Sequence, residues 1–268
     1  MDNQLRFLSI GSGSSGNCYY IGTDAYGFLI DAGMSPRAVK KALKEKGLSE
    51  NIWGIFITHD HTDHVRFVGP LSHRLHNPVY STQEVHEAIR NNVHLTDKPE
   101  SANCKCFRKG DHIKVRDFDF QAFPVSHDAA DCMGYSITYH DQRLVIATDL
   151  GFIGMEAAEH IARANYLVIE ANYDESMLLQ GHYPPALKQR VHSHTGHLCN
   201  THTAKFLADN WHEGLTHVFL CHLSQDNNTP DKAYDTIHQA LQAKGIELKV
   251  LKSLPRTAPS ELYVLEKK

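Results

Sequence analysis

Short apolar runs alternate with amphipathic segments along most of this chain, and turn-forming residues close both kinds of segment. Near the N-terminus, apolar runs bounded by Gly/Ser and Asp/Gly turns predict strands at 5–10, 18–22 and 27–30. Later apolar runs predict strands at 52–58, 79–81, 166–170, 217–221, 246–251 and 261–265. Strands that alternate with helices in this way are typical of an α/β fold.

Helix signals fill the intervals between these strands. Ser35 as N-cap, Pro36 in the first turn and Gly47 as the stop predict a helix through about Lys46. The stretch Ser81-Thr82-Gln83-Glu84 has the spacing of a capping box and predicts the start of another helix. Further helices are expected at 64–75, 155–164, 185–191, 200–210 and 230–244.

The middle of the chain has a different pattern. Four strand-like segments follow one another and predict an antiparallel meander at 113–115, 118–124, 135–139 and 144–148. We find no repeat, low-complexity stretch or long linker. With 268 residues and 41% hydrophobic content the chain can bury a large core. We therefore expect one domain over residues 1–268, or two tightly fused halves.

Polar residues follow directly on several of the buried strands. Thr58-His59 comes after 52–57, His127 after 123–126, Asp149 after 144–148 and His222 after 218–221. Buried strands fix the backbone, so side chains just beyond their ends can gather at one sheet edge although they are distant in sequence. We expect these four segments to converge.

The most specific of these segments is His59-Asp60-His61-Thr62-Asp63-His64. Its three imidazoles and the Asp63 carboxylate can surround one or two divalent ions. Neutral imidazole suits zinc and other late first-row metals, while carboxylate also accepts harder ions. A set without cysteine leaves a coordination position open for a reactive hydroxide. The pattern therefore predicts a metal-dependent hydrolase.

The chain carries 20 histidines, so some of them must lie near each other by chance. Most are expected on surfaces or helix faces, for example His73, His76, His86, His94, His160 and His238. Taken singly, Asp149 could be a turn residue, and His127 or His222 a hydrogen-bonded core histidine. The combination with the 59–64 cluster favours ligand roles for all three.

The formal net charge of −4 argues against binding to nucleic acid by bulk electrostatics. A nuclease remains compatible with it, because a metal centre supplies local positive charge. Basic residues that could line a groove, or simply face solvent, are Arg108, Lys109, Lys114, Arg116, Lys188 and Arg190.

The six cysteines form no C-x-x-C pair, and neither end shows a signal peptide or a long apolar span. We therefore expect a cytoplasmic protein without disulfides or membrane association.

Together these motifs resemble the metallo-β-lactamase superfamily. The matching elements are Leu29-Ile30-Asp31-Ala32-Gly33, the 59–64 cluster, His127, Asp149 and His222, in the order of that family. The resemblance implies an α/β (α+β) fold, the αββα four-layer sandwich of two similar halves with the site along one edge. It assigns His59, His61 and His127 to one metal ion, Asp63, His64 and His222 to the other, and Asp149 as the bridge. Asp31 more plausibly orients these ligands than binds metal itself.

A narrower resemblance concerns the later motifs. Glu170-Ala171-Asn172-Tyr173 and Gly196-His197-Leu198 are similar to motifs that flank the last ligand in tRNA 3′-processing enzymes. Segments 12–17, 126–131, 196–200 and 222–228 are similar to the YycJ/WalJ (VicX) exonuclease group, except that Cys132 and Cys199 replace an expected Pro and Ser. This group implies 5′→3′ exonuclease action on DNA. The chain lacks a β-CASP insertion and a tRNA-binding arm, which disfavours structured RNA.

The resulting hypothesis is a dinuclear phosphodiesterase with two divalent ions, zinc or manganese, with iron as a further option. The ions share a hydroxide that attacks phosphorus, with Asp63 both as ligand and as catalytic residue. His197, oriented by Glu170, donates a proton to the departing 3′ oxygen; alternatively His197 is a plain residue before an Asn200 helix cap. Candidates for contact with substrate phosphate are Ser126, Ser224 and Asn227. For Gly11–Gly16, a tight turn is the favoured interpretation and a phosphate-binding loop is the alternative.

Three other functions stay open at this point. The same hydroxide could act on a small ester, a thioester, a lactone or a β-lactam. A flavo-di-iron protein shares the scaffold, but it typically has Glu where His61 stands and a fused flavin domain. A metal-free binding module is disfavoured because every expected ligand is present. The expected partner is DNA, single- or double-stranded with a 5′ end, and the sequence sets no oligomeric state.

Overall fold

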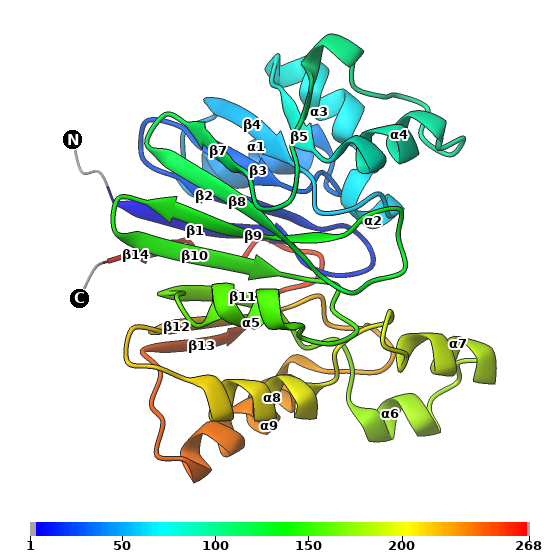
Figure 1. Ribbon diagram of the computed structural model, residues 1–268, viewed down its shortest axis with the longest axis vertical. Coiled ribbons are helices and arrows are strands. Elements are labelled where there is room, and N and C mark those ends of the chain that lie inside the picture. The colour runs from blue at the N-terminus through cyan, green and yellow to red at the C-terminus, as the bar shows by residue number, and fades with distance from the viewer. Residues whose placement is uncertain (1–3, 267–268) are drawn as a thin grey trace. The chain divides into compact units, whose positions relative to one another are not determined.

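The computed structural model describes residues 4–266, which divide into two compact units (Figure 1). The first unit comprises residues 4–115, 129–131 and 255–266, and the second comprises 116–128 and 132–254. Each unit contains strands of one mixed sheet together with its own helices. The expectation of one domain stays a prediction.

The sheet of the first unit has the order β14-β1-β2-β3-β4-β5-β6. Its strands β14, β1, β2 and β3 pair antiparallel, and β3, β4, β5 and β6 pair parallel. The strands are β1 (Leu5–Gly11), β2 (Cys18–Gly22), β3 (Gly27–Ile30), β4 (Ile52–Phe56), β5 (Val79–Ser81), β6 (Cys104–Cys106) and β14 (Tyr263–Leu265). All residues of β2 and β3 are buried, as their apolar runs predict.

The first helix of this unit, α1 (Pro36–Glu45), has the expected signals. Ser35 accepts a hydrogen bond from the Ala38 N–H at 3.2 Å, and Gly47 adopts φ +65° just beyond the helix. The helix packs against β1 and α3. The helix boundaries expected here are therefore confirmed to within one residue.

The helix expected at 64–75 is in fact two helices, α2 (Thr62–Val65) and α3 (Val68–Leu75). Phe67 leaves helical geometry at φ −118° and ψ 20°. Its N–H donates to the carbonyl of Ala32 at 2.9 Å instead of to a carbonyl of α2. A tertiary hydrogen bond thus interrupts a segment that reads as one helix in the sequence.

The capping box at 81–84 is wrong, although the helix it announces, α4 (Gln83–Asn91), is present. The N-cap is Thr82, and its hydroxyl donates to Asp131 at 2.9 Å without capping the helix. Ser81 belongs to β5 and donates to the Ile57 carbonyl at 3.1 Å. The 3-10 helix η1 (Ser101–Asn103) and strand β6 follow without having been predicted.

The strands of the second unit follow the order β13-β12-β11-β10-β9-β8. Strands β8, β9 and β10 form the antiparallel meander that the sequence predicts, and β10, β11, β12 and β13 are parallel. They are β8 (Phe118–Pro124), β9 (Met133–Tyr139), β10 (Gln142–Ala147), β11 (Tyr166–Glu170), β12 (His217–Cys221) and β13 (Val250–Ser253), and β7 (His112–Val115) precedes them in the chain. The strand expected at 246–251 is thus displaced toward the C-terminus.

Five helices belong to the second unit: α5 (Met155–Ile161), α6 (Glu175–Gln180), α7 (Pro185–Val191), α8 (Asn200–Asn210) and α9 (Pro230–Ala243). Of these, α6 was not predicted. Helix α5 packs against β8 and β10, and α8 packs against α9 (Figure 1). Their apolar faces and the strands enclose one core, in which Ile169, Leu220 and Ile237 are fully buried.

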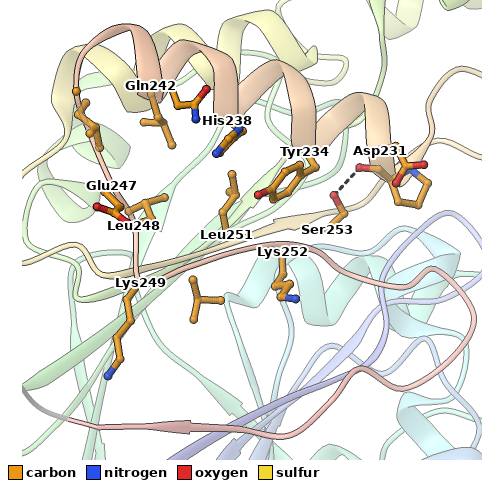
Figure 2. Close-up of a pocket in the computed structure, with 15 residues that line it drawn as sticks. Asp231, Tyr234, His238, Gln242, Glu247, Leu248, Lys249, Leu251, Lys252 and Ser253 are labelled. Atoms are coloured by element: carbon orange, nitrogen blue, oxygen red, sulfur yellow. Dashed lines mark hydrogen bonds between the residues drawn. The ribbon is translucent and has the colours of Figure 1, made fainter.

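A hollow of about 780 Å³ lies beside α9 and β13 and is lined by Tyr234, His238 and Leu251, among others (Figure 2). Ser253 donates to the Pro230 carbonyl at 2.9 Å at one end of it. None of the predicted site residues lines this hollow. The predicted site residues therefore lie in another part of the fold.

His217, at the start of β12, has a perturbed pKa. Burial, with a smaller effect of Lys249, lowers this pKa to about 4.

Within residues 4–266, no helix combines the length and the apolar character needed to cross a membrane.

Candidate metal centre

Three predicted site residues have a left-handed backbone just after a buried strand. Asp31 follows β3 with φ 62°, Asp149 lies beyond the end of β10 with φ 55°, and His222 follows β12 with φ 54°. Residues other than glycine rarely adopt positive φ, although Asp and His do so more often than most. Each side chain is therefore aimed by a sharp turn that a rigid strand holds in place.

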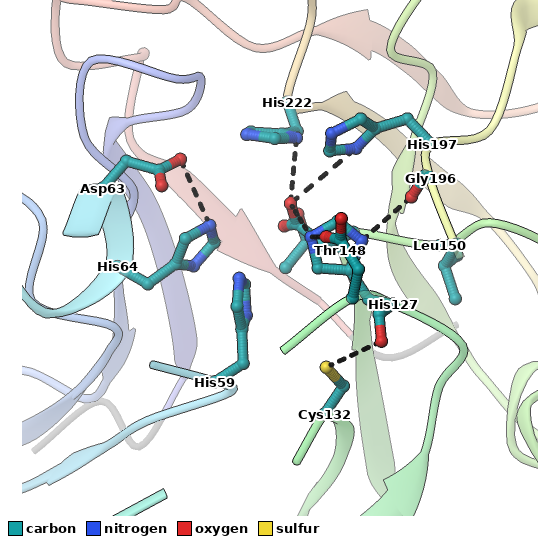
Figure 3. A network of polar contacts seen from close by, with 12 residues as sticks. His59, Asp63, His64, His127, Cys132, Thr148, Leu150, Gly196, His197 and His222 are labelled. Atoms are coloured by element: carbon teal, nitrogen blue, oxygen red, sulfur yellow. Dashed lines mark hydrogen bonds and ion pairs between the residues drawn. The ribbon is translucent and has the colours of Figure 1, made fainter. Parts of the chain in front are cut away.

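The 59–64 cluster of the first unit begins in the loop after β4 and ends within helix α2, whose N-cap is His61. The ring centroids of His59 and His61 are 4.7 Å apart, and those of His59 and His64 are 4.1 Å apart. The Asp63 carboxylate lies 3.5 Å from His64 Nε2 (Figure 3). His59 and His64 are buried, while His61 and Asp63 are partly exposed. The sequence cluster is thus also a spatial cluster within its unit.

Asp31 is fully buried behind this cluster. Its carboxylate accepts hydrogen bonds from His64 Nδ1 at 2.7 Å, from the Thr58 N–H at 2.8 Å and from the Thr58 hydroxyl at 3.0 Å. Burial raises the pKa of Asp31, against the opposing effects of His64 and Thr58. Because the Thr58 hydroxyl donates to Asp31, its oxygen accepts from His59 Nδ1 at 3.0 Å. Asp31 therefore orients two imidazoles, one directly and one through Thr58.

Asn17 fixes the other side of His64. Its Oδ1 accepts from the Gly13 N–H at 2.8 Å, which orients the amide. The Nδ2 group then faces His64 Nε2 at 2.9 Å and the Asp63 carboxylate at 3.1 Å. Since Nδ2 can only donate, His64 Nε2 must carry a lone pair.

Close backbone packing holds these loops together at Gly33. A Cβ atom at this position would overlap the Asp63 carbonyl oxygen and would meet the Asn17 nitrogen at 2.5 Å. Gly33 N–H donates to the Asn17 carbonyl at 2.9 Å, and Asn17 N–H donates to the Asp63 carbonyl at 2.8 Å. Only glycine allows the segment after β3 to approach the start of α2 this closely.

In the second unit, Glu170 at the end of β11 is the central acceptor. One of its oxygens accepts from His197 Nδ1 at 2.8 Å and from His222 Nδ1 at 2.9 Å. The other accepts from the backbone N–H groups of Leu150 at 2.8 Å and Leu198 at 3.0 Å. Burial alone would raise the pKa of Glu170, but the interactions with His197 and His222 outweigh it and hold the pKa below its usual range.

His127 and Asp149 lie close to this group. His127 Nδ1 donates to the Gly196 carbonyl at 2.9 Å, and its Nε2 lies 3.6 Å from Asp149 Oδ1 (Figure 3). The same oxygen of Asp149 lies 3.3 Å from His222 Nδ1 and 3.8 Å from His197 Nδ1. The second unit therefore brings three histidines around two buried carboxylates.

A single hydrogen-bonding rule covers five of the histidines. In each of them Nδ1–H donates to a fixed acceptor: Thr58 for His59, Asp31 for His64, Gly196 for His127, and Glu170 for both His197 and His222. The lone pair is therefore on Nε2, which is the state that a metal ligand requires. In His64 this lone pair faces Asn17 Nδ2 at 2.9 Å, so a metal ion would have to replace that contact.

The donors in both units fit divalent metal ions. Neutral imidazoles and carboxylates are the ligands that zinc, manganese and iron accept. In the second unit, one donor atom from each of Asp149, Glu170, His197 and His222 lies within 4.8 Å of the others. The four hydrogen bonds that Glu170 already accepts use its lone pairs, so Glu170 orients the ligands while Asp149 and His222 remain the better ligands.

The three residues predicted to contact substrate have different surroundings. Ser126 is half-buried and donates to the His194 carbonyl at 2.8 Å. Ser224 is 7% exposed and its oxygen accepts from the Asn227 N–H at 3.2 Å. Asn227 is 1% exposed, and its side chain lies against Gly181. Their contact with substrate stays a prediction.

Two residues that act on the candidate ligands were not predicted. Asn17 orients His64, and Asn172 donates through Nδ2 to the His222 carbonyl at 2.7 Å, which holds the left-handed turn. Asn17 lies in segment 12–17 and Asn172 in segment 170–173, two motifs that carry the family resemblance in the sequence. The signal that could have identified them is a buried amide beside a strand end, which a sequence alone does not distinguish from an ordinary turn residue. Asn200 is not the helix cap, because Cys199 is the N-cap of α8.

Comparison with known proteins identifies one family and two curated relatives. Residues 26–213 match the family model described as the β-lactamase superfamily domain. The chain is 36% identical over 242 residues to the exodeoxyribonuclease YycJ of Bacillus anthracis, which covers 90% of each chain. It is 33% identical over 259 residues to the exodeoxyribonuclease WalJ of Streptococcus pneumoniae, which covers 95% of this chain and 96% of the relative.

A solved structure supports the same fold. The metallo-β-lactamase fold protein YhfI from Bacillus subtilis matches with a TM-score of 0.65 at 17% identity, over 93% of this chain and 97% of the other. The predicted fold class, with its two mixed sheets flanked by helices, is therefore confirmed.

Proposed function

The chain belongs to the metallo-β-lactamase superfamily, and we propose that it is a metal-dependent exodeoxyribonuclease that digests DNA from the 5′ end. The observation that carries this proposal is the 36% identity to a named exodeoxyribonuclease over 90% of both chains. The hydrogen-bonded histidines described above support the metal dependence, because their Nε2 lone pairs are fixed by neighbouring acceptors.

The proposed centre holds two divalent ions. His59, His61 and His127 would hold one ion, Asp63, His64 and His222 the other, and Asp149 would bridge them. Zinc and manganese are the proposed metals, and iron has compatible chemistry. When bound, such a pair of ions lowers the pKa of a bound water and offsets the charge of a phosphate group.

The protein's own residues supply orientation and a proton. Asp31 and Glu170 hold their imidazoles through Nδ1, so that each Nε2 keeps one direction. His197 is the proposed proton donor: its side chain is 21% exposed, unlike the enclosed His222 at 4%. His197 Nδ1–H donates to the Glu170 carboxylate, which orients the ring, and a proton taken up on Nε2 would pass to the departing 3′ oxygen as the bond to phosphorus breaks. The product would be a 5′ nucleotide.

The candidates for substrate contact lie beside the proposed metal ligands in the sequence. Ser126 and Ser224 stand one and two residues from the proposed ligands His127 and His222, and Asn227 hydrogen-bonds Ser224. We propose DNA phosphate as their partner and a reducing compartment such as the cytoplasm as the location, since none of the six cysteines forms a disulfide in residues 4–266.

The test is a product assay with each metal added separately. DNA labelled at its 5′ end, in single- and double-stranded form, should release a labelled mononucleotide at once, whereas DNA labelled at its 3′ end should shorten gradually. His127→Ala should abolish the cleavage, and the matched control His238→Ala on α9 should retain it.

Two outcomes would contradict the proposal. Early release of the label from the 3′ end would reverse the polarity. Hydrolysis of a thioester or a lactone without cleavage of any DNA would move the chain to the small-substrate branch of the family.

A further inference from the structure

A second group of potential metal ligands lies where helices α6 and α8 begin. Glu175 is the first residue of α6, Cys199 is the N-cap of α8, and His202 lies in the first turn of α8. Cys199 and His202 therefore both lie at the N-terminal end of α8. One donor atom from each of the three residues lies within 4.8 Å of the others. The group shares no residue with the centre proposed above.

The donor types in this group are those of a zinc site. Zinc binds thiolate at about 2.3 Å and imidazole nitrogen or carboxylate oxygen at about 2.0–2.2 Å, so its ligands lie somewhat less than 4 Å apart. The sulfur of Cys199 is enclosed by the fold, whereas the side chains of Glu175 and His202 reach solvent. A small rotation of these two side chains would bring all three donors onto one ion.

The structure already holds the sulfur and the carboxylate together. The Thr201 hydroxyl lies 3.1 Å from Cys199 Sγ and donates to Glu175 Oε2 at 3.2 Å. On the other side, Tyr173 and Cys199 form an isolated parallel bridge that fixes the backbone of the cysteine. The donors come from two different helices, so their approach is a product of the tertiary fold.

A purely structural role for Cys199 explains less of this arrangement. A cysteine that only fills the small core with Tyr173 and Leu178 would not require an imidazole and a carboxylate beside its sulfur.

We propose that Glu175, Cys199 and His202 bind a single zinc ion, with a fourth position left for water. On binding, the S–H bond of Cys199 breaks, its proton passes to solvent, and a sulfur–zinc bond forms. Affinity should therefore rise with pH. An ion at this position would tie the first turn of α6 to the first turn of α8.

The test uses the full-length protein loaded with cobalt(II). Thiolate bound to cobalt(II) absorbs in the near ultraviolet through charge transfer, and a centre made only of His and Asp ligands gives no such band. The wild-type protein should show the band, and Cys199→Ser should lose it. Cys106→Ser, at an exposed cysteine of β6, is the matched control and should keep it.

Two exposed ligands make the test independent of the folding of the Cys199 variant. His202→Ala and Glu175→Gln should each weaken cobalt binding at this site by about tenfold or more. His202→Ala should also contain one zinc equivalent fewer than wild type after equilibration with zinc. A band that persists in Cys199→Ser, or an unchanged band and zinc content in His202→Ala, would overturn the proposal. Neither result depends on whether the protein cleaves DNA.

Discussion

The substitution Glu170→Gln probes the hydrogen-bond network that orients two proposed functional histidines. In the wild type, each carboxylate oxygen accepts two hydrogen bonds, one pair from imidazoles and the other pair from backbone N–H groups. Glutamine keeps one acceptor oxygen and replaces the other with an NH₂ group, which only donates. Whichever way the amide turns, two buried donors lose their acceptor.

The size of the effect follows from that count. A buried donor without an acceptor costs about 1–3 kcal/mol, so Glu170→Gln should lower the free energy of unfolding by about 2–6 kcal/mol. This is a large share of the roughly 5–15 kcal/mol that stabilises a typical domain. Metal affinity should also fall by about 10- to 100-fold when the NH₂ group faces the imidazoles, since His222 then loses the acceptor that orients it.

Urea unfolding followed by circular dichroism measures the first effect, and metal analysis after dialysis measures the second. The matched control is Glu159→Gln on the exposed face of α5, which should change the unfolding free energy by less than about 0.5 kcal/mol. A loss below about 1 kcal/mol in Glu170→Gln, with unchanged metal content, would refute the role of this carboxylate as a fourfold acceptor.

Three further predictions concern single residues. His197→Ala should keep its metal content and lose about 10²- to 10⁴-fold in single-turnover rate, because the proton donor is removed; an unchanged rate would place the acid elsewhere. Asp149→Ala should lose bound metal in elemental analysis, and a wild-type metal count would contradict a bridging role. His217 has a folded pKa of about 4, below the unfolded value of 6.5, so its stabilising effect is complete above the unfolded pKa and declines as the pH falls toward the folded one. It should account for about 2 kcal/mol of lost stability between about pH 7.5 and about pH 5, and His217→Gln should lose that much less over the same range in urea titrations. An identical pH dependence in the two proteins would show that folding leaves the pKa of His217 unchanged.

The strands predicted best are those whose apolar runs are buried along all or nearly all of their length. The bounds of β11 and β12 agree with the sequence prediction, and those of β4 differ only at its C-terminal end. The errors arise where a distant group competes with a local signal. Ser81 bonds the neighbouring strand instead of capping a helix, and Phe67 bonds a loop instead of continuing one. Local patterns carry no information about such partners.

The candidate site also has features that the sequence predicts and features that it does not. The candidate ligands and the candidate proton donor could be proposed from residue type and from their position after strands, and the contact expected between Glu170 and His197 is present at 2.8 Å. The sharing of that carboxylate with His222 and the amide contact from Asn17 to His64 were not predictable. Both depend on the geometry of turns that only the folded chain defines.

The left-handed turns at Asp31, Asp149 and His222 matter for protein engineering. Glycine would relax the backbone at each of these positions, where a side chain with positive φ costs about 1 kcal/mol or more. At Asp31 the same change would leave the buried donors of His64 and Thr58 without their acceptor, at a cost of about 1–3 kcal/mol each. Searches for thermostable variants should therefore leave Asp31 untouched, and glycine at Asp149 or His222 would remove a proposed metal ligand.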